Sequence, residues 1–334
     1  AFSYHQYGMT QYKNVFAVRQ NLSLAVLAQL ISAREPLDHV LALALGKLVD
    51  LANAICRWEP VAECPRNVYA AGRVRPAWEF AEGVPISDSS GSFDVCLANL
   101  IDGIVSVGQL PRVGTTQIAA AQKSPLPDTV ASVWFTDPPY YDAYPYADLS
   151  DVFFVWFKRA LRSCDAIRDP FDFSNALTPK LSEAVQDESR ISDGGPKDRA
   201  FFETTMGMSF AEGRRVIADN GIGCIVFAHK TTEGWEALLS GIISGKLTIT
   251  ASWPIATELA HRLRAKDSAA LATSVHLVCR PRIGNEIGDW SDVFRALPGR
   301  VADWMERLQG HGVRGAVLVF ACIGPALEIY SRYA

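Results

Sequence analysis

Apolar residues recur at three- and four-residue spacing in several parts of the chain, which is the pattern of amphipathic helices. Two such stretches cover residues 18–33 and 37–58, and Pro36 and Asp38 separate them. Residues 59–92 are rich in Pro, Gly, Ser and Arg, which predicts an extended connection. Further helices are expected over residues 93–107, 147–162, 198–219 and 235–244, and again after Pro281. Asp148 or Ser150 is the expected cap of the helix at 147–162.

Short apolar runs bounded by turn residues alternate with these helices. Strands are expected over residues 115–121, 126–137, 224–230, 247–255 and 271–282, with a turn at 220–223. The alternation predicts a doubly wound α/β sheet. In a parallel sheet of this kind the strands end at one edge, where ligands bind. We therefore expect Asp137, Lys230 and Trp253, which end three of the runs, to lie near that edge.

Composition narrows the class of protein. The chain has 334 residues, 49% hydrophobic and 20% charged, and a net charge of −4. This describes a globular protein that is no general polyanion binder, so nucleic acid would need a local basic patch. The longest apolar run, residues 315–330, is too short for a membrane span, and the first residues do not have the pattern expected of a signal peptide. Seven scattered cysteines without a CxxC pair predict reduced thiols in a cytoplasmic protein and no metal site.

The segment "VWFTDPPYYDAYPYADLSD", residues 133–151, ends an apolar run with Asp137-Pro138-Pro139-Tyr140. Proline lacks an N–H and fixes φ, so this backbone is stiff and presents carbonyl oxygens. A carboxylate beside a rigid carbonyl gives two acceptors, which suits an exocyclic amino group. Tyr140 offers a face on which a base can stack, worth about 1–3 kcal/mol. If both amino hydrogens are accepted, the nitrogen lone pair is free to attack an electrophilic methyl group. The competing interpretation is an acidic turn with aromatic packing.

The sequence resembles the DPPY-motif amino-methyltransferases, which methylate adenine N6 or cytosine N4 in DNA. It looks like the large adenine-specific DNA methylase-like proteins of bacteria and archaea that are found near defence systems. Further strings resemble that family in family order and span nearly the whole chain: "YGMTQYKNVFAVRQ", "AICRWEP", "SDSSGSF", "TPKLSEAV", "FAHKTTEGWEALL", "ASWPIATE" and "ALATSVHLVCRPR".

The resemblance implies a Rossmann-like, S-adenosylmethionine-dependent methyltransferase fold, represented in part and with added N-terminal helices. It implies that Asp137 and the carbonyl of Pro138 accept hydrogen bonds from the target amino group and that Tyr140 stacks on the base, with Pro139 in the same motif. Such enzymes must extrude the base from the duplex, at a cost of a few kcal/mol. Tyr141 and Asp142 are expected to line the pocket. DNA is the expected partner, other defence-system proteins are further candidates, and no membrane is expected.

The methyl donor implied by the resemblance is S-adenosylmethionine. The family carries a Gly-rich DPFAGGG-type loop after its first strand, and the chain contains no such loop. We therefore expect the chain to be a piece of a longer protein that lacks the donor half-site and, alone, to be inactive and to bind the donor weakly in calorimetry. Ala120, Ala121 and Gln122, at the end of the strand expected before Asp137, would touch the donor's adenine.

Other strand ends supply candidate substrate-binding residues. His229 and Lys230 would lie beside the DPPY motif. An ordinary polar strand end explains these two residues equally well. Trp253, with Thr257 and Glu258, would lie at the rim, and a packed Trp is the alternative. The loop "HRLRAK", residues 261–266, is the best local basic patch; phosphate contact and a solvated charge run are both compatible with it.

The chain is expected to comprise a helical region at 1–112, the DPPY-containing half of a methyltransferase domain at 113–284, and a helical segment at 285–334. Adenine N6 in DNA is the expected target; cytosine N4 and RNA remain open. A non-catalytic nucleic-acid-binding subunit is the rival from another class, and the presence of Asp137 and Tyr140 speaks against it. A protein-glutamine methyltransferase ranks last, because such enzymes usually carry Asn at the position of Asp137.

Overall fold

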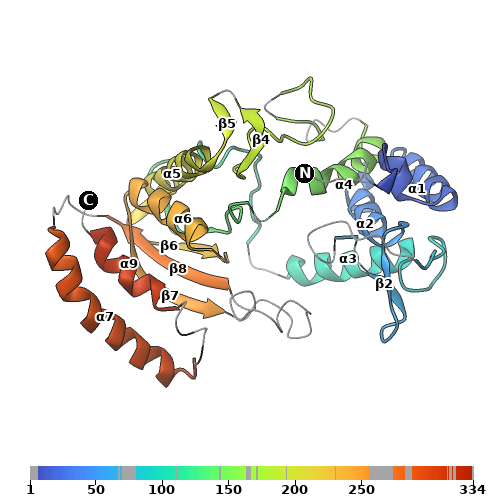
Figure 1. Cartoon of the computed structure of the whole chain (residues 1–334). Helices are drawn as coiled ribbons and strands as arrows, with labels where there is room; N and C mark the ends of the chain where they lie inside the picture. Colours follow the sequence, from blue (N-terminus) through green and yellow to red (C-terminus); the bar gives the residue numbers. More distant parts are fainter. Residues whose placement is uncertain are drawn as a thin grey trace. The chain divides into compact units, whose positions relative to one another are not determined.

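The computed structural model describes residues 7–66, 68–69, 80–109, 112–142, 144–162, 167–170, 172–192, 194–229, 231–255, 274–282, 288–313, 315, 318 and 321–332. The chain folds into two compact units (Figure 1). Unit 1 comprises Ala1–Ile118 and Pro145–Glu183, and unit 2 comprises Ala119–Tyr144 and Ala184–Ala334. Each unit is discontinuous in sequence, whereas the pattern of the sequence predicts three continuous segments.

Unit 1 is mainly helical. Its elements are the short 3-10 helix η2 (Tyr12–Val15), the helices α1 (Val18–Ile31), α2 (Asp38–Leu51), α3 (Phe93–Gly108) and α4 (Tyr146–Ala160), and a hairpin of β1 (Arg57–Glu59) and β2 (Cys64–Arg66). Four α-helices were expected here and are found, but the helix expected over 37–58 is too long: α2 ends at Leu51, and Arg57 and Trp58 belong to β1. The expected cap of α4 is wrong, because Pro145 occupies the N-cap position and makes no side-chain cap bond.

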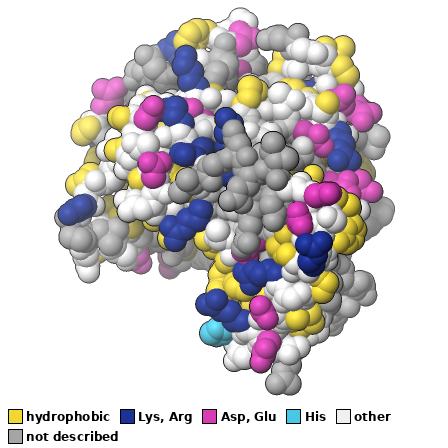
Figure 2. All heavy atoms as spheres, turned by 90° about the vertical axis from the view of Figure 1, so that its left-hand side faces the viewer, with side chains coloured by type: hydrophobic (Ala, Val, Ile, Leu, Met, Phe, Trp, Pro, Cys, Tyr) yellow, Lys and Arg dark blue, Asp and Glu magenta, His cyan; other side chains and the backbone are white. Residues whose placement is uncertain are grey.

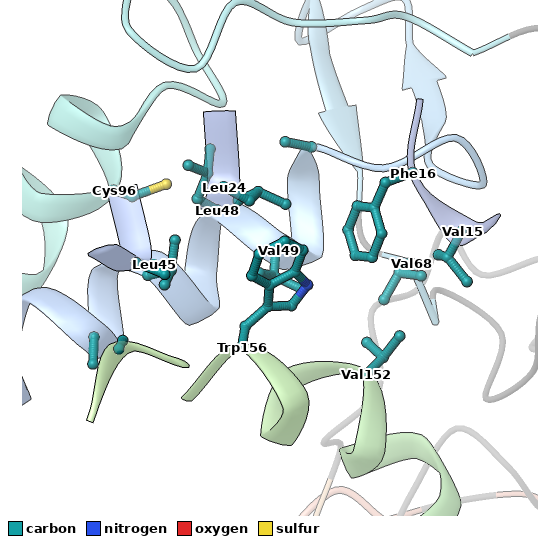
Figure 3. Packing of buried hydrophobic residues seen from close by; sticks show 14 of the residues in the cluster. Val15, Phe16, Leu24, Leu45, Leu48, Val49, Val68, Cys96, Val152 and Trp156 are labelled. Atoms are coloured by element: carbon teal, nitrogen blue, oxygen red, sulfur yellow. The ribbon is translucent and has the colours of Figure 1, made fainter. Parts of the chain in front are cut away.

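The four helices of unit 1 meet in one apolar core (Figure 3). Leu24 of α1 and Leu48 of α2 are fully buried, and Cys96 of α3 and Trp156 of α4 are nearly so. The ring of Phe16 packs edge-on against Trp156 at 5.6 Å between centroids. The core therefore brings the N-terminal helices together with α4, which lies more than a hundred residues away in sequence.

A buried carboxylate ties the last segment of unit 1 to α4. Asp151 accepts hydrogen bonds from the hydroxyl of Tyr12 at 2.9 Å and from the backbone N–H of Thr178 at 3.0 Å, and it pairs with the ammonium of Lys180 at 2.7 Å. Two strings quoted above for the family resemblance, at 7–20 and 178–185, therefore meet at one structural residue. Tyr12, Thr178 and Lys180 thus attach two separate segments of unit 1 to α4.

Unit 2 is built on a four-stranded sheet in the order β3-β6-β8-β7. Its strands are β3 (Ala131–Thr136), β6 (Ile217–Phe227), β7 (Leu247–Ile255) and β8 (Ser274–Pro281). β3 and β6 are parallel, and β8 runs antiparallel to both β6 and β7. Consequently β3, β6 and β7 run in the same direction and end at the same edge of the sheet, as expected. The class is mixed α/β with a mixed sheet, so the expected parallel pairing is wrong for β8.

Two local strand and turn predictions are wrong. Residues 115–121 form no strand, and residues 112–119 are exposed. In the described sheet β3 is an edge strand that pairs only with β6, and the exposed residues 112–119 can satisfy their backbone with water instead. The expected turn at 220–223 lies inside β6, where the guanidinium of Arg280 donates to the carbonyl oxygens of Asn220 and Gly221 at 2.9 and 3.2 Å.

Helices α5 (Arg199–Val216) and α6 (Thr232–Ser244) cover one face of this sheet (Figure 1). Phe202 and Phe210 of α5 and Leu238 of α6 form one buried cluster with Ile225 and Leu277 of the sheet. α7 (Trp290–Gly310) and α9 (Ile323–Arg332) pack beside β7, where the hydroxyl of Ser331 accepts from the N–H of Ile249 at 3.1 Å. A hairpin of β4 (Asp187–Ser192) and β5 (Gly195–Lys197), which the sequence did not predict, precedes α5.

Helix α5 approaches β3 closely through a glycine, and this contact predicts a stability effect. A Cβ added at Gly213 would lie 2.5 Å from Cζ2 of the Trp134 indole. We expect Gly213→Ala to destabilise the protein by about 1–3 kcal/mol, because α5 or Trp134 must shift. Gly299→Ala in α7 is the matched control: that Cβ meets nothing within 4 Å, so it should be neutral or slightly stabilising. Urea unfolding of both variants tests this, and equal midpoints would refute the contact's importance.

Candidate functional site

The loop of residues 137–142 follows β3 at the edge where β3, β6 and β7 end. The side chain of Asp137 is exposed, whereas Pro138 below it is buried. Pro139 and Tyr140 are half-buried, and Tyr141 is buried with 8% of its surface exposed. The carboxylate of Asp137 thus faces solvent, while the residues that follow it in the loop are packed into unit 2.

The backbone of this loop turns sharply at the two tyrosines. The N–H of Tyr141 donates to the carbonyl oxygen of Pro139 at 3.0 Å, which closes a tight turn around Tyr140. Tyr141 has φ +53°, a left-handed conformation that costs a bulky residue about 1–2 kcal/mol. Gln186 donates its N–H to the carbonyl of Tyr141 at 3.2 Å. Neighbouring packing therefore holds the loop in a conformation that its own sequence does not favour.

The two tyrosines of the motif have different surroundings. The ring of Tyr141 packs edge-on against Phe202 at 5.1 Å and against His229 at 5.6 Å, and burial raises its pKa. Tyr140 packs edge-on against Phe227, the last residue of β6, at 5.5 Å. Tyr141 is therefore an anchor of the loop. Tyr140 is half-buried and follows the exposed Asp137 by three residues.

His229 follows β6 and joins it to the loop. Its Nε2 lies 3.2 Å from Oδ1 of Asp142, and its Nδ1 accepts the backbone N–H of Thr231 at 3.2 Å. Since Nδ1 accepts, Nε2 carries the proton and donates to Asp142. The carbonyl of His229 accepts the indole N–H of Trp235 at 3.1 Å. Asp142 and His229, predicted separately as substrate-binding residues, are thus brought together as a pair.

Sequence reasoning missed two residues that place His229. Thr231 caps α6, and its Oγ1 accepts the N–H of Gly234 at 3.4 Å. A Cβ at Gly234 would lie 2.5 Å from Cγ of His229, so a glycine makes room for the imidazole over the first turn of α6. The string "HKTTEGW" contains a signal for the start of a helix, a Thr three residues before a Gly. That this Gly makes room for His229 can be seen only in the fold.

Trp253 packs against the C-terminal helices. Its ring lies 5.3 Å from that of Trp304 and 5.9 Å from that of His311, and the guanidinium of Arg307 lies over it at 5.8 Å. These contacts favour the packing interpretation over a contact with the base. Lys230, Thr257, Glu258 and the loop 261–266 lie outside the described residues.

The residues expected to touch the methyl donor form a turn instead of a strand end. The N–H of Lys123 donates to the carbonyl of Ala120 at 2.9 Å; Ala120 and Gln122 are half-buried and Ala121 is exposed. The following segment is anchored at the end of α5, where Ser124 donates its N–H to Glu212 at 2.7 Å. Since α5 leads into the start of β6, this anchor lies at the sheet edge opposite to the loop.

An ion-pair cluster that sequence reasoning missed makes this anchor. Arg215 contacts Asp128 and Glu212, and it donates to the carbonyl oxygens of Ser124 at 3.2 Å and Leu126 at 2.9 Å. Hydrogen bonds from Arg215 hold the pKa of Glu212 below its usual range. Both residues therefore fix the approach of the chain to β3 and have no described link to the loop at 137–142.

Metal-ligand clusters and membrane-spanning helices are both missing from the part of the chain that the structure describes. There, no three His, Cys, Asp or Glu side chains are placed to hold a metal ion, and no helix has the length and apolarity to cross a membrane. The described cysteines are free thiols, as expected, and burial raises the pKa of Cys56 to about 12.

The surface in Figure 2 carries charges of both signs. Lys and Arg side chains are intermixed with Asp and Glu over the described residues of that face, with no continuous basic surface among them. Any phosphate contact on this face would therefore be local.

Comparisons with known proteins give no match. No family model matches the chain, and no curated protein and no solved structure matches it either.

Proposed function

We propose that the protein methylates the exocyclic N6 amino group of an adenine that has been extruded from DNA. The observation that carries this proposal is the exposed carboxylate of Asp137, held on a stiff Asp-Pro-Pro-Tyr loop at the edge where three strands end. Ligands of α/β sheets bind at such edges. The half-buried ring of Tyr140, three residues further on, supports the same interpretation.

In this proposal the loop prepares the amino group for attack. Asp137 accepts one amino hydrogen and the carbonyl of Pro138 accepts the other, so the nitrogen lone pair is directed away from the ring. Tyr140 stacks on the extruded base, and Pro139 keeps the two acceptors and the ring at a fixed separation. The new N–C bond would replace the donor's bond between sulfur and the methyl carbon, whose electron pair would stay on the sulfur, and the nitrogen would lose one hydrogen as a proton to water. The account thus assigns binding and orientation to the loop.

S-adenosylmethionine would supply the electrophilic methyl group. We assign none of the described residues to hold it, because the segment after Ala120–Gln122 is anchored at the opposite sheet edge. The same placement favours a second candidate function, a nucleic-acid-binding subunit that extrudes bases without methylating them. We also propose that the mixed α/β architecture is a Rossmann-like methyltransferase fold.

The test uses the full-length gene product with tritiated S-adenosylmethionine and unmethylated DNA or RNA. We expect label in DNA above that in RNA, and loss of label when the adenines are replaced by purine lacking the amino group. A parallel assay with 2-aminopurine at adenine positions reports extrusion as a rise in fluorescence. Fluorescence without incorporated label would support the non-catalytic subunit. The absence of both signals would refute both functions.

A further inference from the structure

Both ring nitrogens of His229 are occupied by groups of the protein. Nε2 donates to Asp142 and Nδ1 accepts from Thr231, both at 3.2 Å. Only 8% of the residue is exposed. A histidine in this state has neither a nitrogen nor a ring face to offer to a nucleobase, although it lies next to the loop that carries Asp137 and Tyr140.

The contacts of His229 lead to the loop by two routes. The first is direct: it donates to Asp142 and packs edge-on against Tyr141, the residue in the left-handed conformation. The second passes through Phe227, on which the imidazole stacks at 6.1 Å with 19° between the planes. Phe227 in turn packs against the edge of Tyr140 at 5.5 Å. One ring therefore supports both the anchoring and the stacking tyrosine.

The pairing with Asp142 joins a buried and an exposed side chain. The side chain of Asp142 is 59% exposed, so water competes for its carboxylate, whereas His229 is buried. A pair whose carboxylate is open to water contributes little to overall stability. It does fix the far end of the loop against the end of β6. Its effect is therefore expected in the geometry of the loop more than in the stability of the fold.

We propose that His229 is a positioning residue that sets the orientation of Tyr140 through Asp142, Tyr141 and Phe227, without contacting the nucleobase. The inference deepens the function proposed above and rests on it. It replaces the expectation that His229 and Asp142 bind the substrate directly.

The kinetic test uses variants that separate the two nitrogens. His229→Gln keeps a side-chain amide N–H near the place of Nε2, and His229→Asn keeps a group only near the place of Nδ1. We expect Asp142→Ala and His229→Asn to lower kcat for DNA methylation by about 100-fold, the cost of a misplaced reacting group, with a smaller change in KM. His229→Gln and Asp142→Asn should keep most of the wild-type rate, because each keeps a hydrogen bond between the two positions. Asp102→Asn, exposed on α3, is the control.

The double variant His229→Asn/Asp142→Ala completes the test. If the pair acts as a unit, it should be no slower than either single variant. The proposal would be overturned if the fold-losses in kcat of the two single variants multiplied in the double variant. It would also be overturned if kcat of Asp142→Ala were within twofold of wild type. Since Asp142 is exposed, its variants should keep the melting temperature of the parent, which separates positioning from unfolding.

A readout without nucleic acid separates this inference from the proposed function. Nitrogen-15 NMR should show the Nε2-protonated tautomer of His229, and Asp142→Ala should shift that signal. The opposite tautomer, or no shift, would overturn the inference whatever the protein methylates. If the expected tautomer is seen but no nucleic acid is methylated or extruded, the proposed function fails, and with it the role in positioning Tyr140.

Discussion

Replacing Asp137 by alanine is expected to abolish methyl transfer and to leave the fold intact. The side chain is exposed at the end of β3, so its removal creates no cavity. In the proposed mechanism it is the only charged acceptor for the target amino group. Loss of one such preorganised hydrogen-bonding group typically lowers kcat by about 10²–10³-fold. Initial rates with labelled donor, at saturating DNA, measure the effect.

Two controls make the Asp137 result specific. Asp137→Asn keeps an oxygen that can accept one amino hydrogen but has no charge, so it should fall between wild type and Asp137→Ala. Asp102→Asn removes an exposed carboxylate from α3 and should keep the full rate. An Asp137→Ala rate above a tenth of wild type, with unchanged thermal stability, would contradict the role assigned to this carboxylate.

Placing an alanine at Gly234 should be the most damaging single-methyl change near the loop. Its Cβ would lie 2.5 Å from Cγ and 2.8 Å from Cε1 of His229, and the imidazole is held in place by Thr231 and Asp142. Alanine is the better helix former by about 1 kcal/mol, yet overpacking at a buried site costs about 1–3 kcal/mol. We expect net destabilisation together with loss of the Asp142 contact.

Thermal unfolding and methylation rates, measured together, check the Gly234 prediction. Gly299→Ala is the control, since its Cβ meets nothing within 4 Å in another helix of unit 2. Gly234→Ala should melt below this control and should lose activity even at temperatures where it is fully folded. Melting at the same temperature as Gly299→Ala would show that the imidazole can move aside, and that Gly234 is not required for its position.

Local patterns were enough to predict most elements and the position of the candidate site. Apolar spacing predicted α1 and α5 to within a few residues, because each buries one stripe against a core, whereas the helix predicted at 37–58 ends at Leu51 in the structure. The motif Asp137-Pro138-Pro139-Tyr140 predicted a loop at a strand end, since two prolines cannot continue a strand.

The remaining features depend on tertiary context. The alternation of side chains along β8 is the same in either direction, so the pattern could not show that β8 runs antiparallel between β6 and β7. Tyr141 adopts positive φ without being a glycine because Phe202 and His229 bury its ring. The role of His229 depends on Thr231 and Gly234, whose importance is visible only once α6 begins beneath the imidazole.

We propose above that the Asp137–Tyr140 loop serves amino-group methylation of a base. The most direct test is mass spectrometry of nucleosides from the DNA of a host that lacks methyltransferases and expresses the full-length gene. The account predicts N6-methyldeoxyadenosine with the wild-type gene and none with Asp137→Ala at equal protein levels. N4-methyldeoxycytidine instead would keep the amino-group chemistry and correct the base. Methylated nucleosides at equal levels for both genes, or in neither although the protein is folded, would contradict the account.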